Sequence, residues 1–137
     1  MNYNIVGKYI KNINFNIPDS KSYFLIEKNI KNYKINFDIK SKKIKENIFE
    51  IDTNLKLMSE EPVENKIEVS IIFSTLISLK EDIKNKKDLK KIVLVDVPTS
   101  IYPEIRSVLV FLFEKSGFKQ ISLEKTIDFH SLYEKNN

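Results

Sequence analysis

Hydrophobic and polar residues alternate in four stretches of the first 80 residues. This period of two predicts β-strands with one buried face and one wetter face. The first stretch ends at Pro18, which has no amide hydrogen to donate to a sheet. In the fourth, Ile72 and Leu76 also place apolar side chains on the polar side. The positions of the predicted buried faces are Tyr9, Ile13, Phe15 and Ile17; Tyr33, Ile35, Phe37 and Ile39; Phe49, Ile51, Thr53, Leu55 and Leu57; and Ile67, Val69, Ile71, Phe73, Thr75 and Ile77.

The segments between these strands differ in length. Residues 18–32 are too many for a tight hairpin and include apolar residues of their own, which predicts a crossover connection. Residues 41–46 and 59–65 are short and polar, as hairpin turns are. The spacing therefore predicts an antiparallel sheet of four strands.

After Leu79 the spacing of apolar residues becomes helical. Leu89, Ile92 and Val93 lie at positions i, i+3 and i+4, and Pro98 is expected to end this first helix. A second helix is expected to begin at a cap formed by residue 99 or 100 and to stop at Gly117.

The second helix is apolar on nearly all sides. A helix of this kind is usually buried on two sides, so the chain carries more apolar surface than one small sheet covers. A short amphipathic helix is expected after Asp128, with Phe129, Leu132 and Tyr133 on its apolar face. The apolar positions of the second helix are Ile101, Ile105, Val108, Leu109, Val110, Phe111, Leu112 and Phe113.

Length and composition predict a single α+β domain over residues 1–137. The net charge of +4 comes almost wholly from lysine, and Arg106 is the one arginine. Since nucleic-acid readers rely on arginine and stacked aromatic residues, a solvated lysine surface is the favoured interpretation. The N-terminus lacks the apolar core of a signal peptide, and no apolar run approaches ~18 residues. We therefore expect a cytoplasmic protein that does not insert into membranes.

Candidate catalytic chemistry is sparse. His130 is the single histidine, which excludes a multi-histidine metal site, and its place in the closing amphipathic segment favours a surface or packing role over a catalytic one. There is no cysteine, which excludes a disulfide and a cysteine zinc site. Gly7 and Gly117 are the only glycines, too few for a phosphate-binding loop. Arg106 is suited to holding carboxylates or carbonyls. The glutamates at 60, 61 and 64 fall in a predicted turn and are expected to be solvated. We expect no catalytic residue, no metal and no cofactor.

The surplus of apolar surface points to an oligomer interface or to a groove that binds polypeptides. Three other readings stay open: a monomer whose core absorbs this surface, a basic nucleic-acid-binding module, and a small-molecule carrier with a cavity between sheet and helix.

Several motifs in order along the chain resemble those of SecB, the bacterial protein-export chaperone. YIKNINFNIP (Tyr9–Pro18) resembles the opening strand of that family, and Asn47–Ser59 resembles its Tyr-Glu-Val strand, with Phe49, Glu50 and Ile51 in that place. VPTSIYPEIR (Val97–Arg106) keeps two prolines and the arginine of the family's helix start, with a tyrosine in place of a phenylalanine. Residues 116–118 and the closing IDFHSLY continue the similarity.

The resemblance implies a four-stranded antiparallel sheet with helices packed on one face, assembled as a dimer of dimers. It also implies apolar grooves that hold unfolded precursor proteins before transfer to the motor ATPase SecA, without a cofactor. The implied contacts between dimers are Val69, Ile71 and Phe73. The implied residues of the client-binding groove, or of the core beside it, are Tyr23, Phe24, Leu25, Ile26, Tyr33, Ile35, Phe37, Leu109 and Leu112.

The chain departs from the family at the positions implied to contact SecA. Family members carry acidic residues there, whereas Asn12, Asn16 and Ser70 are uncharged and Glu68 replaces an apolar neighbour. On a chain of net charge +4, electrostatic docking of a basic partner is expected to be weak. Some relatives serve a toxin–antitoxin pair instead of general export, and this alternative also stays open.

Overall fold

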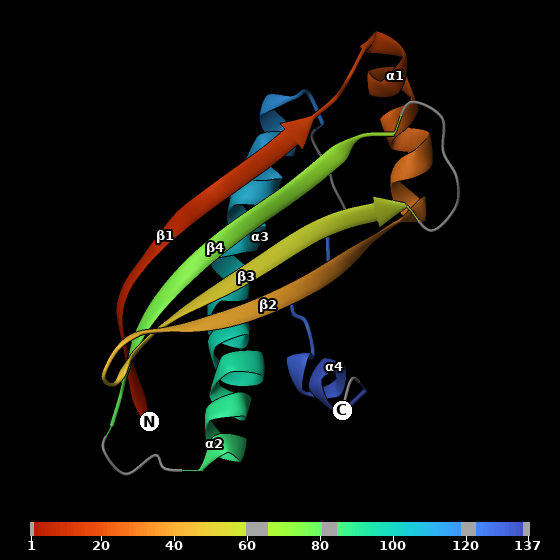
Figure 1. Ribbon diagram of the computed structural model, residues 1–137. Helices are drawn as coiled ribbons and strands as arrows, with labels where there is room; N and C mark the ends of the chain where they lie inside the picture. The colour runs from red at the N-terminus through yellow and green to blue at the C-terminus, as the bar shows by residue number, and fades with distance from the viewer. Residues whose placement is uncertain (1, 60–65, 81–84, 119–122, 136–137) are drawn as a thin grey trace.

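The computed structural model describes residues 2–59, 66–80, 85–118 and 123–135. In this part of the chain, four antiparallel strands form one sheet in the order β1-β4-β3-β2 (Figure 1). Strands β2, β3 and β4 follow one another as a meander, and β1 lies beside β4. The predicted fold class is confirmed. The strands are β1 (Tyr3–Asn16), β2 (Tyr33–Lys45), β3 (Ile48–Ser59) and β4 (Glu68–Leu79).

The connection from β1 to β2 is the predicted crossover, because the two strands lie at opposite edges of the sheet. It contains helix α1 (Ser20–Asn29) and a 3₁₀ turn, Ile30–Asn32. The helix begins after Asp19, whose carboxylate accepts a hydrogen bond from the Ser22 amide at 2.8 Å. The sequence analysis predicted the crossover and did not predict its helix.

Pro98 does not end a helix. Helix α2 (Lys86–Lys91), a π-helical turn (Ile92–Asp96) and helix α3 (Val97–Lys115) follow one another without a break. The π turn ends at Asp96, two residues before Pro98, which has no amide hydrogen to donate to the preceding turn. Thr99, predicted as a cap, donates its hydroxyl to the Val95 carbonyl at 2.6 Å instead. The predicted break was wrong because the helix accommodates the proline with this wider turn.

Helix α3 lies over β3 and β4, and the main core lies between them (Figure 1). Val69, Ile71 and Phe73 belong to this core, with exposed fractions of 6% or less. Their side chains are thus buried within this protomer, and their implied role at a contact between dimers stays a prediction. The most deeply buried apolar side chains of the sheet and of α3 are Ile51, Leu55, Ile71, Ile77, Val97, Ile101, Ile105, Leu109 and Phe113.

Strand β1 does not keep a strict alternation. Its pairing with β4 shifts by one residue between Ile10 and Asn12, which leaves Lys11 in a β-bulge. Ile10 then pairs with Phe73 on the helix side of the sheet, whereas Tyr9 pairs with Ser74 on the opposite, open face. The prediction that placed Tyr9 on the buried face was wrong because the bulge inserts one residue.

On the open face, Lys11 connects β1 to β3. Its ammonium group lies 2.5 Å from a Glu50 carboxylate oxygen and 2.8 Å from one of Asp52, and Asp52 also accepts a hydrogen bond from the Ser74 hydroxyl. Partial burial raises the pKa of Asp52, but the hydrogen bonds from Lys11 and Ser74 outweigh it and hold this pKa below its usual range. Contact with the two carboxylates raises the pKa of Lys11.

Helix α3 ends before Gly117 and helix α4 begins after Asp128, as predicted. Gly117 has a φ of 97°, and the amides of Gly117 and Phe118 donate to the carbonyls of Glu114 and Phe113, which is a Schellman motif. Helix α4 (Phe129–Lys135) begins after Asp128, which accepts a hydrogen bond from the Ser131 amide at 3.0 Å. Among the described residues, no helix is both long and apolar enough to span a membrane.

Replacing Gly117 with alanine should destabilise the protein by about 1–2 kcal/mol, because a side chain disfavours this left-handed backbone. The added Cβ would also lie 2.8 Å from the Tyr23 hydroxyl. Urea unfolding measures the change. Gly7→Ala is the control, since its Cβ would meet Leu76 at an ordinary 3.4 Å. Equal stability of Gly117→Ala and the wild type would contradict this account of the helix end.

Asp52 should make folding stability depend on acid pH. Because the pKa of Asp52 is lower in the folded state, its contribution is present above the unfolded pKa of about 4 and is lost as the pH falls through the folded value. Asp52→Asn should therefore flatten the decline of the unfolding midpoint between about pH 4 and pH 2, measured by thermal melts. Asp38→Asn, on the exposed edge strand, is the control. An unchanged pH profile in Asp52→Asn would count against the network.

Candidate functional site: an apolar trough along strand β2

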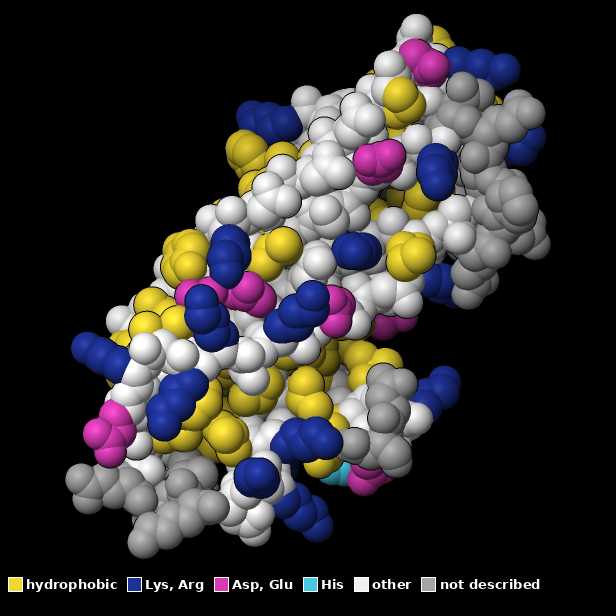
Figure 2. Space-filling model, in the orientation of Figure 1, with side chains coloured by type: hydrophobic (Ala, Val, Ile, Leu, Met, Phe, Trp, Pro, Cys, Tyr) yellow, Lys and Arg dark blue, Asp and Glu magenta, His cyan; other side chains and the backbone are white. Residues whose placement is uncertain are grey.

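Two hollows lie along β2 on the helix side of the sheet, where α3 does not reach. Their volumes are about 600 and 460 Å³, within the usual range of ligand sites. Ile35, Phe37 and Leu132 line both, so the hollows are adjoining parts of one trough. Figure 2 shows hydrophobic side chains gathered between strand β2 and the helices α2 and α4.

The floor of the trough consists of strand β2 and part of β3. Because β2 is an edge strand, no further strand of the described residues pairs with its outer side, and its helix-side residues remain half-buried. Phe37 packs edge-to-face on Phe129 at 4.8 Å between ring centroids and on Tyr102 at 5.9 Å. Tyr33 lies at the far end, where its hydroxyl accepts a hydrogen bond from the Ile67 amide at 3.1 Å. The floor is thus aromatic, apolar and fixed by packing.

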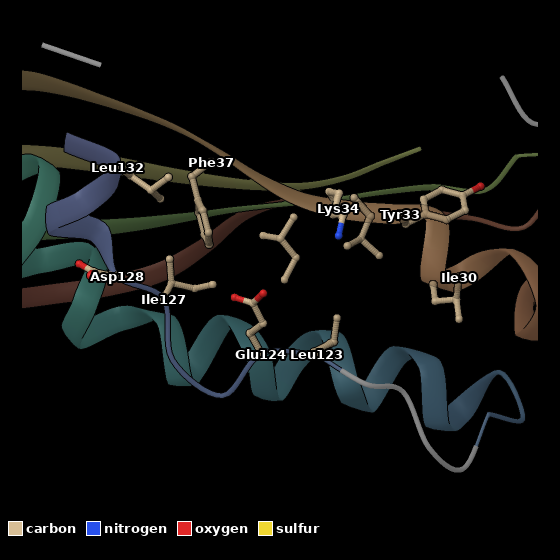
Figure 3. A pocket seen from close by; sticks show the side chains of 11 residues that line it. Ile30, Tyr33, Lys34, Phe37, Leu123, Glu124, Ile127, Asp128 and Leu132 are labelled. Atoms are coloured by element: carbon tan, nitrogen blue, oxygen red, sulfur yellow. The ribbon is translucent and has the colours of Figure 1, made fainter. Parts of the chain in front are cut away.

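The opposite wall is the segment Leu123–Asp128, here called the strap, together with helix α4. Figure 3 shows β2 on one side of the larger hollow and the strap on the other. In that view Phe37, Ile127 and Leu132 lie toward one end, and Ile30 and Tyr33 toward the other. The wall therefore presents apolar side chains opposite the apolar floor.

Charged side chains lie at the edges of this apolar surface. Lys34, Glu124 and Asp128 line the larger hollow, and Asp38 and Lys90 line the smaller one. Hydrogen bonds from the Ser131 amide and hydroxyl hold the pKa of Asp128 below its usual range. Both signs of charge are present, so the trough combines an apolar floor with a mixed polar rim.

The arrangement suits binding rather than bond making. Within the described ranges, no group of three or more histidine, cysteine, aspartate or glutamate side chains is placed to hold a metal ion. His130 is exposed on α4 and lies 3.6 Å from Glu134. The glutamates at 60, 61 and 64 lie outside the described residues. The trough can hold apolar side chains of a ligand, and the open edge of β2 offers it backbone hydrogen-bonding groups.

The predicted groove residues separate into three sets. Tyr33, Ile35 and Phe37 line the trough. Ile26 and Leu109 are in the core, which was the other role considered for them. The remaining four lie outside the two hollows: Tyr23, which is 37% exposed and packs on Phe118, Phe24, which is 77% exposed, and the half-buried Leu25 and Leu112.

The sequence analysis missed the residues of the wall. Leu123 and Ile127 lie between Gly117 and the closing helix, in a segment for which no helix or strand was predicted, so their position opposite β2 was not predicted. Leu132 was recognised as one face of a short amphipathic helix, and that helix is too short to bury its own apolar face. The exposed apolar face of α4 could have indicated from the sequence that this helix borders an apolar surface formed with other elements.

The predicted partner-docking residues are brought together on the open face. Asn16 pairs with Glu68, and Ser70 lies next along β4 on the same side. Asn12 follows on β1 after the bulge. The Asn14 amide donates to the Glu68 carboxylate at 3.4 Å, so the patch carries one carboxylate among uncharged residues. The four residues that differ from the acidic surface of the family thus lie together in one continuous area of the open face.

A second apolar area, here called the β1 strip, lies at the other edge of the sheet. Ile5, Ile10 and Ile13 on the helix side of β1 are each at least 40% exposed, and Phe111 of α3 is 55% exposed. The pair Lys8–Glu104, at 2.8 Å, and the contact of Phe15 with Phe113 hold β1 beside α3 at these levels. The surplus of apolar surface predicted from the sequence is therefore present at both edges.

Comparison with known proteins agrees with this geometry. Among solved structures, the chain is similar to a SecB-like chaperone of Mycobacterium tuberculosis in complex with a peptide from an antitoxin, with a TM-score of 0.69 and 12% identity. The match covers 92% of this chain and 88% of that one, and at this identity it supports the fold.

Relatives identified by sequence show the family to which the chain belongs. A putative protein-export protein SecB of Pelagibacter ubique is 36% identical over 132 residues, covering 96% of this chain and 94% of that protein. The protein-export protein SecB of Burkholderia vietnamiensis is 29% identical, covering 96% of this chain and 80% of its own. The family model described as preprotein translocase subunit SecB matches residues 1–137. The chain therefore belongs to the SecB family of protein-export chaperones.

Proposed function

We propose that this protein binds unfolded segments of precursor polypeptides in the β2 trough and keeps them competent for export. Members of its family are chaperones, not enzymes. The single observation that carries the proposal is the apolar trough beside an unpaired strand edge. A folded protein hides its apolar residues, so a surface of this kind distinguishes unfolded chains from folded ones.

The physical basis of binding is apolar burial plus backbone pairing. At ~25 cal/mol per Å², roughly 500 Å² of buried client surface gives about 12 kcal/mol before ordering costs. An extended client beside β2 would also form main-chain hydrogen bonds, which are independent of sequence. Alternate side chains of such a client would enter the trough, because side chains of a strand alternate. Binding is then firm and tolerant of sequence.

A second copy of the chain is the proposed occupant of the β1 strip. Strand β1 is the other edge of the sheet, so its outer backbone groups face no strand of this protomer. Ile10, Ile13 and Phe111 would be removed from water by a partner placed there. This contact is an alternative to the one expected at Val69, Ile71 and Phe73, whose side chains are buried within the protomer. It leaves the trough, at the opposite edge, open to clients.

We also propose that SecA receives the client from this protein, although the surface expected to contact SecA is less acidic here than in the family. SecA would meet the open face at Asn12, Asn16, Glu68 and Ser70, where one carboxylate remains. We expect contact there to depend on hydrogen bonds more than on charge, and so to respond weakly to salt. A client limited to one antitoxin is the alternative, and the range of polypeptides bound distinguishes the two.

Substituting a residue of the trough should weaken chaperone activity. Leu132→Ser removes an apolar side chain that lines both hollows, and it should raise several-fold the protein concentration needed to suppress aggregation of a denatured precursor. Light scattering measures the suppression. Met58→Ser, on the open face and 53% exposed, is the matched control. Equal losses in the two variants, or none in Leu132→Ser, would contradict a client site in the trough.

Association of copies should depend on the β1 strip. The wild type should have a solution mass that is a multiple of the 16.1 kDa chain, and Ile10→Asp combined with Ile13→Asp should shift the mass toward the monomer. Sedimentation velocity measures both. Asn12→Asp on the open face of β1 is the control. A monomeric wild type, or a double variant with unchanged mass, would refute this interface.

A further inference from the structure

We infer that Tyr102 and Arg106 of α3 are positioning residues for polypeptide binding, because they hold the strap, Leu123–Asp128, at its distance from β2. The inference rests on the proposed function and deepens it. Neither residue lines the two hollows. Their effect on a client would pass through the wall that they anchor.

The strap has little backbone structure of its own. It contains no helix or strand, and the carbonyls of Ile127 and Asp128 accept hydrogen bonds from amides of α4. Within the described residues, its backbone forms no hydrogen bond to the backbone of the sheet or of α3. A sheet strand is placed by its ladder, but a segment of this kind is placed by side chains. The position of the strap therefore depends on the side chains of α3 that contact it.

Tyr102 and Arg106 supply those contacts at two consecutive carbonyls. The Tyr102 hydroxyl donates to the Glu124 carbonyl, and Arg106 Nη2 donates to the Leu123 carbonyl at 3.4 Å. The two residues are four positions apart on a helix, so they lie on the same face one turn apart. A single face of α3 thus holds the strap at adjacent points.

The anchored residues are also residues of the wall. Leu123 and Glu124 accept these hydrogen bonds through their carbonyl groups, and their side chains line the larger hollow. Figure 3 shows the Glu124 carboxylate directed into the space between the strap and β2. A displacement of the two carbonyls would therefore move lining side chains directly.

The environment of both anchors favours a lasting contact. Tyr102 is 2% exposed, and burial raises its pKa despite the nearby Arg106, so its hydroxyl keeps the proton that it donates. Among the described residues, Arg106 Nε is buried without a hydrogen-bond partner. An unpaired buried N–H is unfavourable, so packing alone would favour an apolar residue at this position. A side chain retained at that cost fits a role in holding the strap.

Tyr102→Phe tests the inference, because it removes the hydroxyl and keeps the ring that packs on Phe37. One lost hydrogen bond of ordinary strength should weaken binding of a fluorescent, permanently unfolded peptide about three- to tenfold, mainly through faster dissociation. Amides of the strap should exchange faster with deuterium, while those of β3 and β4 should be unchanged. Stopped-flow fluorescence and hydrogen-exchange mass spectrometry measure the two effects.

Tyr9→Phe is the matched control. It also removes a tyrosine hydroxyl that donates a hydrogen bond, to Glu50 at 3.4 Å, but on the open face. It should leave peptide affinity and strap exchange unchanged. Arg106→Lys keeps the charge and loses the planar fork, so it should give an intermediate effect, and Arg106→Met a larger one.

The outcomes separate the inference from the proposed function. A wild type that fails to bind the peptide would refute the function. A wild type that binds, with unchanged affinity in Tyr102→Phe, would refute the inference alone. Faster strap exchange without a change in affinity would also refute it, because the strap would then not set the site. Faster exchange throughout β3 and β4 would assign Tyr102 a general structural role and overturn the inference.

Discussion

One layer of apolar side chains holds this protein together, and α3 covers only its middle. The helix lies over β3 and β4, where residues such as Ile51, Ile71 and Ile105 are almost wholly excluded from water. The sheet is wider than the helix, so β1 and β2 extend beyond it on either side. The apolar side chains of these two edge strands therefore remain partly exposed to water. The trough beside β2 and the β1 strip are the two ends of this same layer.

The two faces of the sheet differ in chemistry and carry different tasks. Apolar side chains on the helix side offer burial to unfolded chains and to a second copy of the protein. The open face holds asparagines, serines and the ion-pair network of Lys11, Glu50 and Asp52. Figure 2 shows basic and acidic side chains lying side by side on this face. In the proposed function, client binding and partner docking lie on opposite sides of the sheet, so neither needs to displace the other.

The strands and their inward faces were predictable because alternation records burial directly. The floor residues Tyr33, Ile35 and Phe37 were found for this reason. The bulge at Lys11 was not predicted, because the sequence around it does not reveal one inserted residue. The continuous helix through Pro98 was missed because a π turn compensates locally for the missing amide. The strap was missed because tertiary contacts from Tyr102 and Arg106 place it, and these appear only when distant segments are brought together.

The most direct measurement of client binding is hydrogen exchange of the β2 backbone with and without a saturating, permanently unfolded polypeptide. If clients lie in the trough and pair with the strand edge, alternate amides of residues 33–39 and the strap should become protected, whereas the outer edge of β1 should not. If the polypeptide binds and β2 exchanges unchanged, or if protection is confined to residues of the open face, the trough is not the client site.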